Sequence, residues 1–584
     1  MDNQLQPDAS GLYFPENEEQ LVALVKTAYR LNKGLRVRGS GHSVAAAIYT
    51  DPLVPADYTV DKQTPPAGIH TDGQHINVAL SKYRGLSWVD ETQGLLVADA
   101  GIYLGRNSMD PTSTVENSLL YQLGMKGWAL SDLGGITEQS ISGFISTGSS
   151  GGSLQFSVYE NILGLRLIDG LGNVYEVFRD KDFEGFHAAV TSMGLLGVIS
   201  KVYLKAVPTF NITGQEAITT LEDASVDMFG DGTTGRPSLE QFLRDVEYTR
   251  LEWWPQRHGE RLVVWQAQRI KPQLGFRPVR YEEFTNSPEA AEIGISIFYT
   301  IIGNLDDLSQ AAPKLRATFK EIDQDLTVLF SGWGEIGKLL AAFVSKAMEF
   351  GVDIAIAFLQ PFAPLIKEQL PSLFNGVLDV FIPLDSTKKG MDKNEPQSFR
   401  DWGWQGLPMD NQASDVLAPT EFTEIWIPLP YTQKAMVLLR DYFAAPGKTD
   451  QEALARTGTY AFEIYAAKPN PFWMSMSHSD GRDEWKDGVV RVDAYWFVGN
   501  AGNPAEVFYP QFWKLFREAG IPFRLHWGKF QPMLSDGDPE GWVEFFRKQY
   551  PRWDDFLARR REKDPQGIFF TEYWRQRFGQ SGSR

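Results

Sequence analysis

Apolar residues near the start of the chain recur at helical spacing. Leu21 and Ala28 lie on the apolar face of a predicted helix, which begins after Asn17. Asn17 and Gln20 have the spacing of a capping box, and Gly34 predicts where the helix stops.

Short runs with the two-residue period of strands follow. They predict an α+β unit that ends near Pro208, with a hairpin turn over residues 169–173, where Asp-Gly-Leu-Gly-Asn joins two strands. A helix is predicted over 183–192. The predicted strands are Leu35–Arg38, His75–Leu80, Leu95–Ala100, Leu163–Ile168, Val174–Phe178 and Gly197–Leu204.

The pattern changes after residue 210. A long apolar stretch of helical period covers 292–384, and the polar, Gly- and Pro-rich stretch 388–419 indicates loop. The apolar stretch could form a core or cap, a dimer interface, or a face that lies on a membrane surface. Strands are predicted over Tyr248–Trp254, Arg261–Ala267, Thr423–Ile427, Tyr460–Tyr465 and Val489–Phe497, and C-terminal helices over Ala505–Ala519, Pro539–Lys548 and Trp553–Lys563.

Composition narrows the class of protein. A chain of 584 residues is too long for one hydrophobic core, and 43% hydrophobic with 22% charged residues is ordinary for a globular enzyme. The net charge of −18 repels phosphate backbones, so no nucleic-acid partner is expected. The chain has no cysteine, which excludes disulfides, thiolate metal ligands and cysteine nucleophiles, and we expect no metal site.

Targeting signals are not evident. Residues 1–11 lack the basic and apolar regions of a signal peptide. The longest apolar candidate for a membrane span, 339–362, is interrupted by Lys346, Glu349 and Asp353. The default expectation is therefore a cytoplasmic protein.

Two glycine-rich segments carry the candidate chemistry. The first predicted strand runs into Gly39-Ser40-Gly41-His42-Ser43, a turn whose backbone N–H groups could approach a pyrophosphate, although a plain surface loop has the same composition. In the second segment, 133–152, Ser, Thr and Gly make up thirteen of twenty residues and are interleaved with Ile and Phe. A flexible linker would not keep those apolar residues, so backbone wrapped around a ligand is the better interpretation. Neither a dinucleotide fingerprint nor a Walker motif is present.

These motifs resemble the FAD-binding domain of the vanillyl-alcohol oxidase superfamily. The resemblance is carried by Arg38–Ser43, Gly134–Ser140, Asn161–Leu165 and Gly194–Ile199. Near the C-terminus, His526-Trp527-Gly528-Lys529 and Asp564–Phe569 resemble the branch of aldonolactone and alditol oxidases. The longer apolar middle also shows some resemblance to type II cholesterol oxidases.

The resemblance implies an α+β fold with three parts. Residues 10–210 would form a two-subdomain, PCMH-type FAD-binding domain. Residues 211–510 would form a large mixed-sheet substrate (cap) domain, with the apolar helical insertion at about 290–385. The segment 511–584 would complete the flavin site.

The resemblance also implies the cofactor and the residues that hold it. His42 occupies the place of the histidine that carries FAD covalently in relatives, and the covalent bond would raise the flavin's potential and prevent cofactor loss. Noncovalent FAD in the same fold is the alternative. The implied cofactor-binding residues are His42, Arg38, Gly39, Ser40, Gly41, Ser43, Gly134, Gly135, Glu138, Ser142, Gly143, Thr147, Gly148, Gly152, Val198, Ile199 and Lys529.

Four residues are implied in catalysis. Glu463 matches the carboxylate of a Glu-x-Arg pair that faces the flavin in sugar-oxidising relatives, and it could bind a substrate hydroxyl or help take its proton. Tyr465 replaces the arginine and points the same way along the strand. Lys529 would stabilise negative charge near the flavin's N1 and C2 oxygen. His526 is either a second polar contact or a packed neighbour.

Two further positions bear on the resemblance. Relatives commonly have Thr-Gly-Thr-His-Gly where this chain has Thr147-Gly148-Ser149-Ser150-Gly151, so a polar ring is lost. Gly134 matches a position near flavin C4a where glycine leaves a path for oxygen, which favours an oxidase.

The expected reaction is hydride transfer from a CH–OH group of a sugar-derived alcohol or aldonolactone to FAD, with O2 as acceptor and H2O2 as product. The alternatives are oxidation of a bulky apolar, sterol-like alcohol, a dehydrogenase with another electron acceptor, and a flavin-binding protein without activity. The expected partners are a small-molecule alcohol and O2, with a homodimer and membrane-surface association left open.

Overall fold

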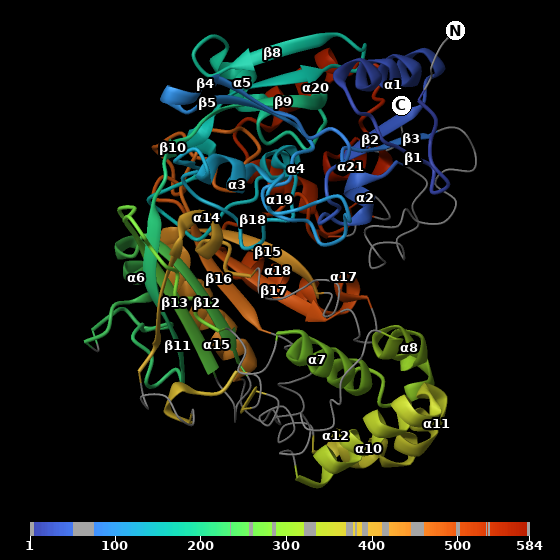
Figure 1. Ribbon diagram of the computed structural model, residues 1–584, viewed down its shortest axis with the longest axis vertical. Coiled ribbons are helices and arrows are strands. Elements are labelled where there is room, and N and C mark those ends of the chain that lie inside the picture. The colour runs from blue at the N-terminus through green and yellow to red at the C-terminus, as the bar shows by residue number, and fades with distance from the viewer. Residues whose placement is uncertain are drawn as a thin grey trace.

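The computed structural model has an upper part built from the two ends of the chain and a lower part built from its middle (Figure 1). The C-terminal helices α20 (Trp553–Lys563) and α21 (Glu572–Arg577) lie among N-terminal elements. The structure describes residues 5–50, 75–233, 235–255, 261–282, 288–320, 334–369, 378–379, 382–387, 395–410, 420–444, 461–497, 503–532, 534 and 538–580.

The N-terminal helix α1 (Glu18–Leu31) begins where the pattern predicts. The Asn17 side chain caps it by accepting from the N–H of Gln20 at 3.0 Å. The helix does not end at Gly34, because Asn32 takes the left-handed conformation (φ 50°) and already turns the chain. Gly34 instead opens strand β2 (Gly34–Arg38), which lies at one edge of a parallel sheet with β3 (His75–Ala79) in its centre and β1 (Leu12–Tyr13) beyond.

A second, antiparallel sheet completes the upper part. Its order is β4-β5-β9-β7-β8. The predicted hairpin is confirmed: the N–H of Asp169 donates to the carbonyl of Asn173 at 3.0 Å, and Gly172 has a positive φ of 80°. Its strands are β4 (Leu86–Asp90), β5 (Leu95–Asp99), β7 (Ile162–Ile168), β8 (Val174–Phe178) and β9 (Val198–Lys205), and the helices α2 (Ala45–Ile48), α3 (Leu119–Gly124), α4 (Ile141–Thr147) and α5 (Phe183–Ala189) lie between strands along the chain.

The lower part is an eight-stranded sheet with the order β14-β11-β13-β12-β16-β17-β15-β18. Every described strand pair in it is antiparallel. The expectation of a mixed sheet was therefore wrong. The consecutive strands β12 and β13 are neighbours in this sheet, as are β16 and β17, and antiparallel neighbours need no crossover connection. The strands are β11 (Asn211–Thr219), β12 (Tyr248–Trp254), β13 (Arg261–Ile270), β14 (Gln397–Trp402), β15 (Thr420–Pro428), β16 (Phe462–Ala467), β17 (Val489–Phe497) and β18 (Arg524–Leu525).

The stretch 388–419 is not only loop. Strand β14 pairs with β11 at the sheet edge, and the short helix α14 (Gly403–Gly406) follows it. This strand was not predicted because its composition is polar, as is common for an edge strand that is partly exposed to solvent. Residues 388–394 and 411–419 of the predicted loop lie outside the described residues.

The apolar insertion forms a separate group of helices beside the lower sheet (Figure 1). These helices enclose a second hydrophobic core, which also takes in Ile218, Trp254 and Val263 from the strands β11, β12 and β13. Many of the described apolar side chains are buried in this core, as one of the three expected uses requires, whereas Met348, Phe350, Ile354 and Leu365 are exposed. The helices are α7 (Pro288–Ile302), α8 (Ala312–Lys320), α10 (Gly334–Phe350), α11 (Val352–Leu359) and α12 (Ala363–Glu368).

The C-terminal helices agree with the pattern, with one difference. The helix predicted over 505–519 is divided into α17 (Pro504–Val507) and α18 (Tyr509–Glu518), because Pro510 lacks an N–H and starts a new first turn. The helix α19 (Trp542–Gln549) precedes α20. None of the helices in the described part of the chain has both the length and the apolar character needed to cross a lipid bilayer.

Candidate active site

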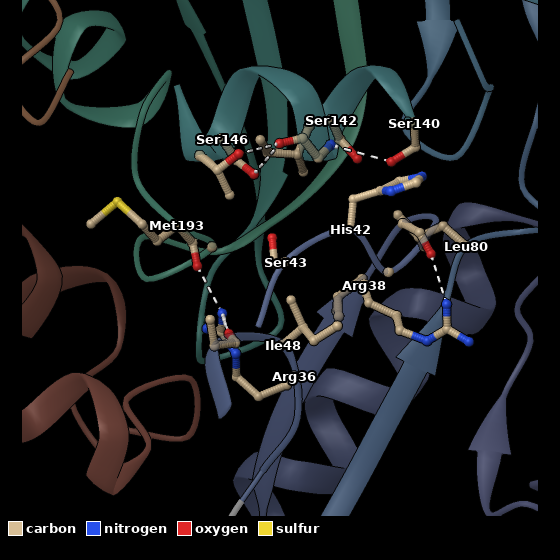
Figure 2. A pocket seen from close by; sticks show the side chains of 18 of the residues that line it. Arg36, Arg38, His42, Ser43, Ile48, Leu80, Ser140, Ser142, Ser146 and Met193 are labelled. Atoms are coloured by element: carbon tan, nitrogen blue, oxygen red, sulfur yellow. Dashed lines mark hydrogen bonds between the residues drawn. The ribbon is translucent and has the colours of Figure 1, made fainter. Parts of the chain in front are cut away.

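A cavity in the upper part gathers four segments that are far apart in sequence. The turn after β2 lies on one side of it, and the serines of α4 lie on the opposite side (Figure 2). The loop before β9 and the C-terminal segment close it. Its lining includes Arg38, Gly39, Ser40, Gly41, His42, Ser43, Ser142, Gly143, Thr147, Gly194, Val198, Ile199, His526, Lys529, Phe569 and Trp574.

The lining of this cavity suits an anionic ligand. Arginine, lysine, histidine, serine and glycine residues contribute to it, and none of the described lining residues is an aspartate or glutamate. Small residues let the backbone approach a ligand closely, and a lining without carboxylates does not repel phosphate. A molecule with a pyrophosphate group fits this chemistry.

Arg36 joins three of the segments that surround the cavity. Its guanidinium donates to the carbonyls of Ala47 at 2.6 Å, Met193 at 2.9 Å and Phe569 at 3.2 Å. One buried side chain thereby joins the N-terminal turn, the loop before β9 and the C-terminal segment. Figure 2 shows Arg36 and Met193 at the same end of the cavity.

His42 stands where the glycine turn meets both the second glycine segment and the C-terminal motif. Its Nε2 lies 3.4 Å from a carboxylate oxygen of Glu138. The Lys529 Nζ donates to the backbone carbonyl of His42 at 3.2 Å, and the N–H of Val44 donates to the carbonyl of Gly528 at 2.8 Å. The turn and the His-Trp-Gly-Lys motif are thus held together.

His526 is a buried, neutral residue of the same motif. Burial lowers the pKa of His526 to about 4, and the neighbouring positive charges of Lys529 and Arg491 act in the same direction. Its Nδ1 accepts from the N–H of Gly528 at 3.1 Å, and its Nε2 lies 3.3 Å from the Ser149 hydroxyl. Ser149 therefore holds the end of the glycine segment at the point where relatives have larger polar residues.

A second group of polar residues lies in the lower sheet, where Glu463 and Tyr465 project from β16. The hydroxyl of Tyr495 donates to Glu463, and the hydroxyl of Tyr465 donates to Asp410 at 2.9 Å. Carboxylate oxygens of Glu252, Asp410 and Glu463 all lie within 4.8 Å of one another. We call Glu252, Asp410, Glu463, Tyr465 and Tyr495 the carboxylate cluster.

One arginine neutralises part of this cluster. Arg250 is fully buried and donates to Asp410 at 2.7 Å, and its guanidinium lies 3.3 Å from Glu252. Burial raises the pKa of Glu463 well above its ordinary value, and the neighbouring charge of Asp410 raises it further. A carboxyl with a raised pKa is a stronger base when ionised, which is the property required for taking a proton from an alcohol.

The carboxylate cluster reaches the upper part through Asp410. The N–H of Asp410 donates to the carbonyl of Gly135 at 2.9 Å. A Cβ atom at Gly135 would lie 1.7 Å from the Asp410 carboxylate and 3.3 Å from the Tyr465 hydroxyl. The cluster therefore packs against Gly135, near the start of the second glycine segment.

An arginine stands opposite Tyr465 on the neighbouring strand. Tyr465 pairs with Arg491 of β17, and the guanidinium carbon lies 4.7 Å from the centre of the tyrosine ring. Arg491 also donates to the carbonyl of Ser150 at 2.8 Å and to Asp493 at 2.9 Å. An arginine of the adjacent strand therefore lies against the ring of Tyr465.

The predicted cofactor residues fall into two groups. The cavity is lined by Arg38, the turn residues 39–43, Ser142, Gly143, Thr147, Val198, Ile199 and Lys529. Gly134, Gly135, Glu138, Gly148 and Gly152 are not among its lining residues. Gly134 packs against the Phe144 ring, Gly135 lies beneath the carboxylate cluster, and Glu138 lies beside His42. Gly148 ends α4 with φ 83°, and Gly152 packs on the carbonyl of Thr249.

Three residues of the site carried no sequence signal. Asp410 lies in a polar, irregular stretch, where one more aspartate is inconspicuous. Arg250 and Arg491 lie on strands, and only the strand register brings them to Asp410 and Tyr465. Pairing Tyr460–Tyr465 with Val489–Phe497 as neighbouring strands could have indicated Arg491.

Known proteins resemble this chain in sequence over part of its length and in fold over nearly all of it. No protein-family profile matches the chain. The D-arabinono-1,4-lactone oxidase of Saccharomyces cerevisiae is 27% identical over 259 residues, which is 44% of this chain and 41% of that protein. The L-gulonolactone oxidase of the shark Scyliorhinus torazame is 26% identical over 265 residues, 45% of this chain and 49% of that protein. Over this part, the chain is similar to the aldonolactone oxidases.

The match to the aldonolactone oxidases spans less than half the length of these curated relatives. Solved structures extend the likeness of the fold to nearly the whole chain. The cholesterol oxidase of Brevibacterium sterolicum has a TM-score of 0.58 at 13% identity, covering 98% of this chain and 96% of that one. At this identity the likeness shows the fold alone, a helix-and-sheet architecture shared with cholesterol oxidase.

Proposed function

We propose that this relative of the aldonolactone oxidases is an FAD-dependent oxidase that acts on a CH–OH group of a sugar-derived alcohol or aldonolactone. One observation carries the proposal: the carboxylate cluster contacts Gly135, and Arg491 joins its Tyr465 to Ser150, the neighbour of Ser149 in the carboxylate-free lining of the cavity. A ligand site and a proton-accepting group are therefore joined by a short chain of contacts.

FAD fits the cavity. The glycine turn and the serines of α4 leave room for a pyrophosphate, and Arg38, His42 and Lys529 bring positive charge or hydrogen-bond donors to it. His42 would carry the flavin covalently, and Lys529, held at the His42 carbonyl, would stabilise the reduced ring. When bound, FAD accepts a hydride and passes two electrons to O2, giving H2O2.

The cluster's own residues would orient the alcohol and move its proton. Glu463 would accept the hydroxyl proton, because burial and the neighbouring Asp410 raise its pKa and make the ionised carboxylate a stronger base. Tyr495 fixes the Glu463 carboxyl, and Tyr465 with Arg250 fixes Asp410, which would bind a second hydroxyl. A polyol or lactone offers several hydroxyls to such a surface.

The same residues favour a sugar-derived substrate over an apolar alcohol. The groups around Glu463 are carboxylates, tyrosines and an arginine, which could hydrogen-bond to several hydroxyls of a sugar-derived ligand, whereas a sterol offers them a single hydroxyl. The buried apolar side chains in the described part of the helical insertion pack into a core that contains no residue of the carboxylate cluster.

The decisive experiment is a panel of aldonolactones, polyols and sterols mixed anaerobically with the purified protein. Bleaching of the flavin absorbance by a lactone or polyol, followed by peroxide release when air is admitted, is the expected result. Bleaching by sterols alone would transfer the activity to apolar alcohols. Bleaching with slow reoxidation by air but fast reoxidation by a dye would identify a dehydrogenase, and absence of bleaching would leave a flavin-binding protein.

The attachment of FAD has an independent test. Acid-precipitated wild-type protein should remain yellow and fluorescent, and His42→Ala should release the flavin to the supernatant. Noncovalent FAD in the same cavity would release the flavin from both proteins.

A further inference from the structure

Glu138 stands beside His42 without lining the cavity that FAD would occupy. Its carboxylate oxygen Oε2 lies 3.4 Å from His42 Nε2, and the side chains are 22% and 12% exposed. We propose that Glu138 is the positioning residue for the covalent attachment of flavin, holding the proton on His42 Nε2 so that Nδ1 presents its lone pair to the flavin's 8α carbon. This inference rests on the proposed attachment at His42.

Glu138 is fixed in place from its other side. Its Oε1 accepts from the backbone N–H of Ser108 at 3.2 Å and from the Ser108 hydroxyl at 2.5 Å. One carboxylate oxygen is thus occupied by Ser108, and the other faces the imidazole. Burial alone would raise the pKa of Glu138, but its contacts with His42 and Ser108 lower the pKa below its ordinary value, so the group stays an acceptor.

The backbone on both sides of this contact is also held. The N–H of Gly105 donates to the carbonyl of Thr137 at 2.6 Å, and the N–H of Leu104 donates to the carbonyl of Gln139 at 2.9 Å. Two backbone hydrogen bonds flanking Glu138 therefore set the distance between the Ser108 loop and the glycine segment. The backbone of Glu138 is thereby fixed relative to this loop.

The backbone of His42 is anchored separately from its ring. Lys529 donates to the His42 carbonyl and Val44 donates to Gly528, so the turn is fixed by the C-terminal motif. Among the described side chains, Glu138 forms the ion-pair contact with the His42 ring. A carboxylate that accepts from one imidazole nitrogen determines the tautomer and the orientation of the other nitrogen.

The attachment step balances with dioxygen as oxidant. A C–N bond forms between His42 Nδ1 and the 8α carbon, and one C–H bond of the methyl group and the N–H bond of the imidazole are lost. The two electrons pass through the flavin ring to O2, which leaves as H2O2 with the two protons. Glu138 accepts the proton that Nε2 gives up once Nδ1 is alkylated and passes it on as one of the two protons of H2O2, which restores the carboxylate.

The test follows attachment rather than turnover. Full-length protein produced in a riboflavin-starved host is mixed with FAD in air, and the flavin fluorescence of acid-precipitated protein is recorded over time. Glu138→Gln should bind FAD but attach it at least about tenfold more slowly than wild type. Ser108→Ala should slow attachment by a smaller factor, because it loosens Glu138 without removing it.

The matched control is Glu116→Gln, an exposed carboxylate on the same loop as Ser108, which should attach FAD at the wild-type rate. Attachment by Glu138→Gln at the wild-type rate would overturn the role of Glu138 while leaving the His42 link intact. Loss of both bound and attached FAD in Glu138→Gln would make Glu138 a binding residue and would also overturn it. A wild-type protein that never retains flavin after acid treatment would overturn the His42 link itself.

Discussion

Tyr465 is a position at which this chain departs from the family that it resembles. A tyrosine occupies the position where the resemblance implies an arginine, and it donates to Asp410. The positive charge is retained by Arg491 on the paired strand. Tyr465 therefore becomes the group that fixes a carboxylate, and its hydroxyl is the atom to test.

Replacing Tyr465 with phenylalanine should weaken substrate binding more than it slows the chemical step. The change removes one hydrogen bond to a charged acceptor, a loss of about 1.5–3 kcal/mol, which corresponds to a rise in KM of roughly tenfold or more. Steady-state kinetics with the best lactone or polyol of the panel would measure it. Tyr431→Phe is the matched control, because the Tyr431 hydroxyl donates to the exposed Glu484 away from the cluster. Equal KM values in both variants would contradict the role of Tyr465.

His526 makes stability depend on pH. Its pKa is lowered to about 4 in the folded protein from 6.5. Because the folded-state pKa is depressed, the unfolded chain binds the proton more tightly, and the stabilisation is complete above about pH 6.5 and is lost as the pH falls toward 4. At pH 5 the loss amounts to about 2 kcal/mol.

The measurement is a double difference. The free energy of unfolding of wild type should fall from pH 7 to pH 5 by about 2 kcal/mol more than that of His526→Gln, because the variant lacks the titrating group. Denaturant unfolding at the two pH values gives both numbers. An identical change in the two proteins would show that His526 is already protonated or solvated in the folded state.

At the scale of elements, the glycine segment 134–152 does two things. Its helix α4 lines the cavity, and its end packs against the lower sheet. The N–H of Thr249 donates to the carbonyl of Gly152 at 2.8 Å, and a Cβ atom at Gly152 would lie 1.9 Å from the Thr249 carbonyl oxygen. The segment is thereby joined to β12, the strand that carries Arg250.

Gly152→Ala should therefore destabilise the protein by about 2 kcal/mol, since the backbone of β12 must shift to admit the methyl group. Thermal unfolding would measure the loss. Gly134→Ala is the control, because its Cβ would lie 3.0 Å from the edge of the Phe144 ring and meets no backbone atom closer than 3.8 Å. A Gly152→Ala protein as stable as Gly134→Ala would show that the junction can relax.

At the scale of the whole molecule, the chain has two hydrophobic cores. The larger one runs through the upper part and into the lower sheet, and the smaller one lies within the helices α7 to α12. Residues of the cavity and the carboxylate cluster lie outside the smaller core. The described residues of the insertion therefore contribute to a core of their own and are not among the residues that line the cavity.

Phe343→Ala should test this separation. Phe343 is fully buried in α10, and its truncation should destabilise the helical group by about 3–5 kcal/mol. Flavin content should stay at the wild-type level, while limited proteolysis should cleave within 288–369 faster. Met348→Ala on the same helix is the control, because Met348 is 47% exposed. Loss of flavin from Phe343→Ala alone would show that the two cores are coupled.

The amino-acid sequence by itself indicated several of the helices and strands and the two continuous motifs of the cavity. Period and capping residues sufficed for α1, the hairpin β7–β8 and the strand β17, because these depend on neighbours a few residues apart. The turn that holds His42 and the motif that holds Lys529 were recognisable for the same reason, since each is a continuous run. Both runs line one cavity, and their role in binding FAD stays a prediction.

Tertiary structure alone decided which distant residues meet. Asp410 and Arg250 are 160 residues apart and come together because β12 lies beneath the chain that follows β14. The antiparallel order of the lower sheet and the edge strand β14 depend on the same long-range pairing. A local pattern records whether a residue is polar or apolar, but the partner of a buried charge is selected by packing across the whole chain, where desolvation makes the contact necessary.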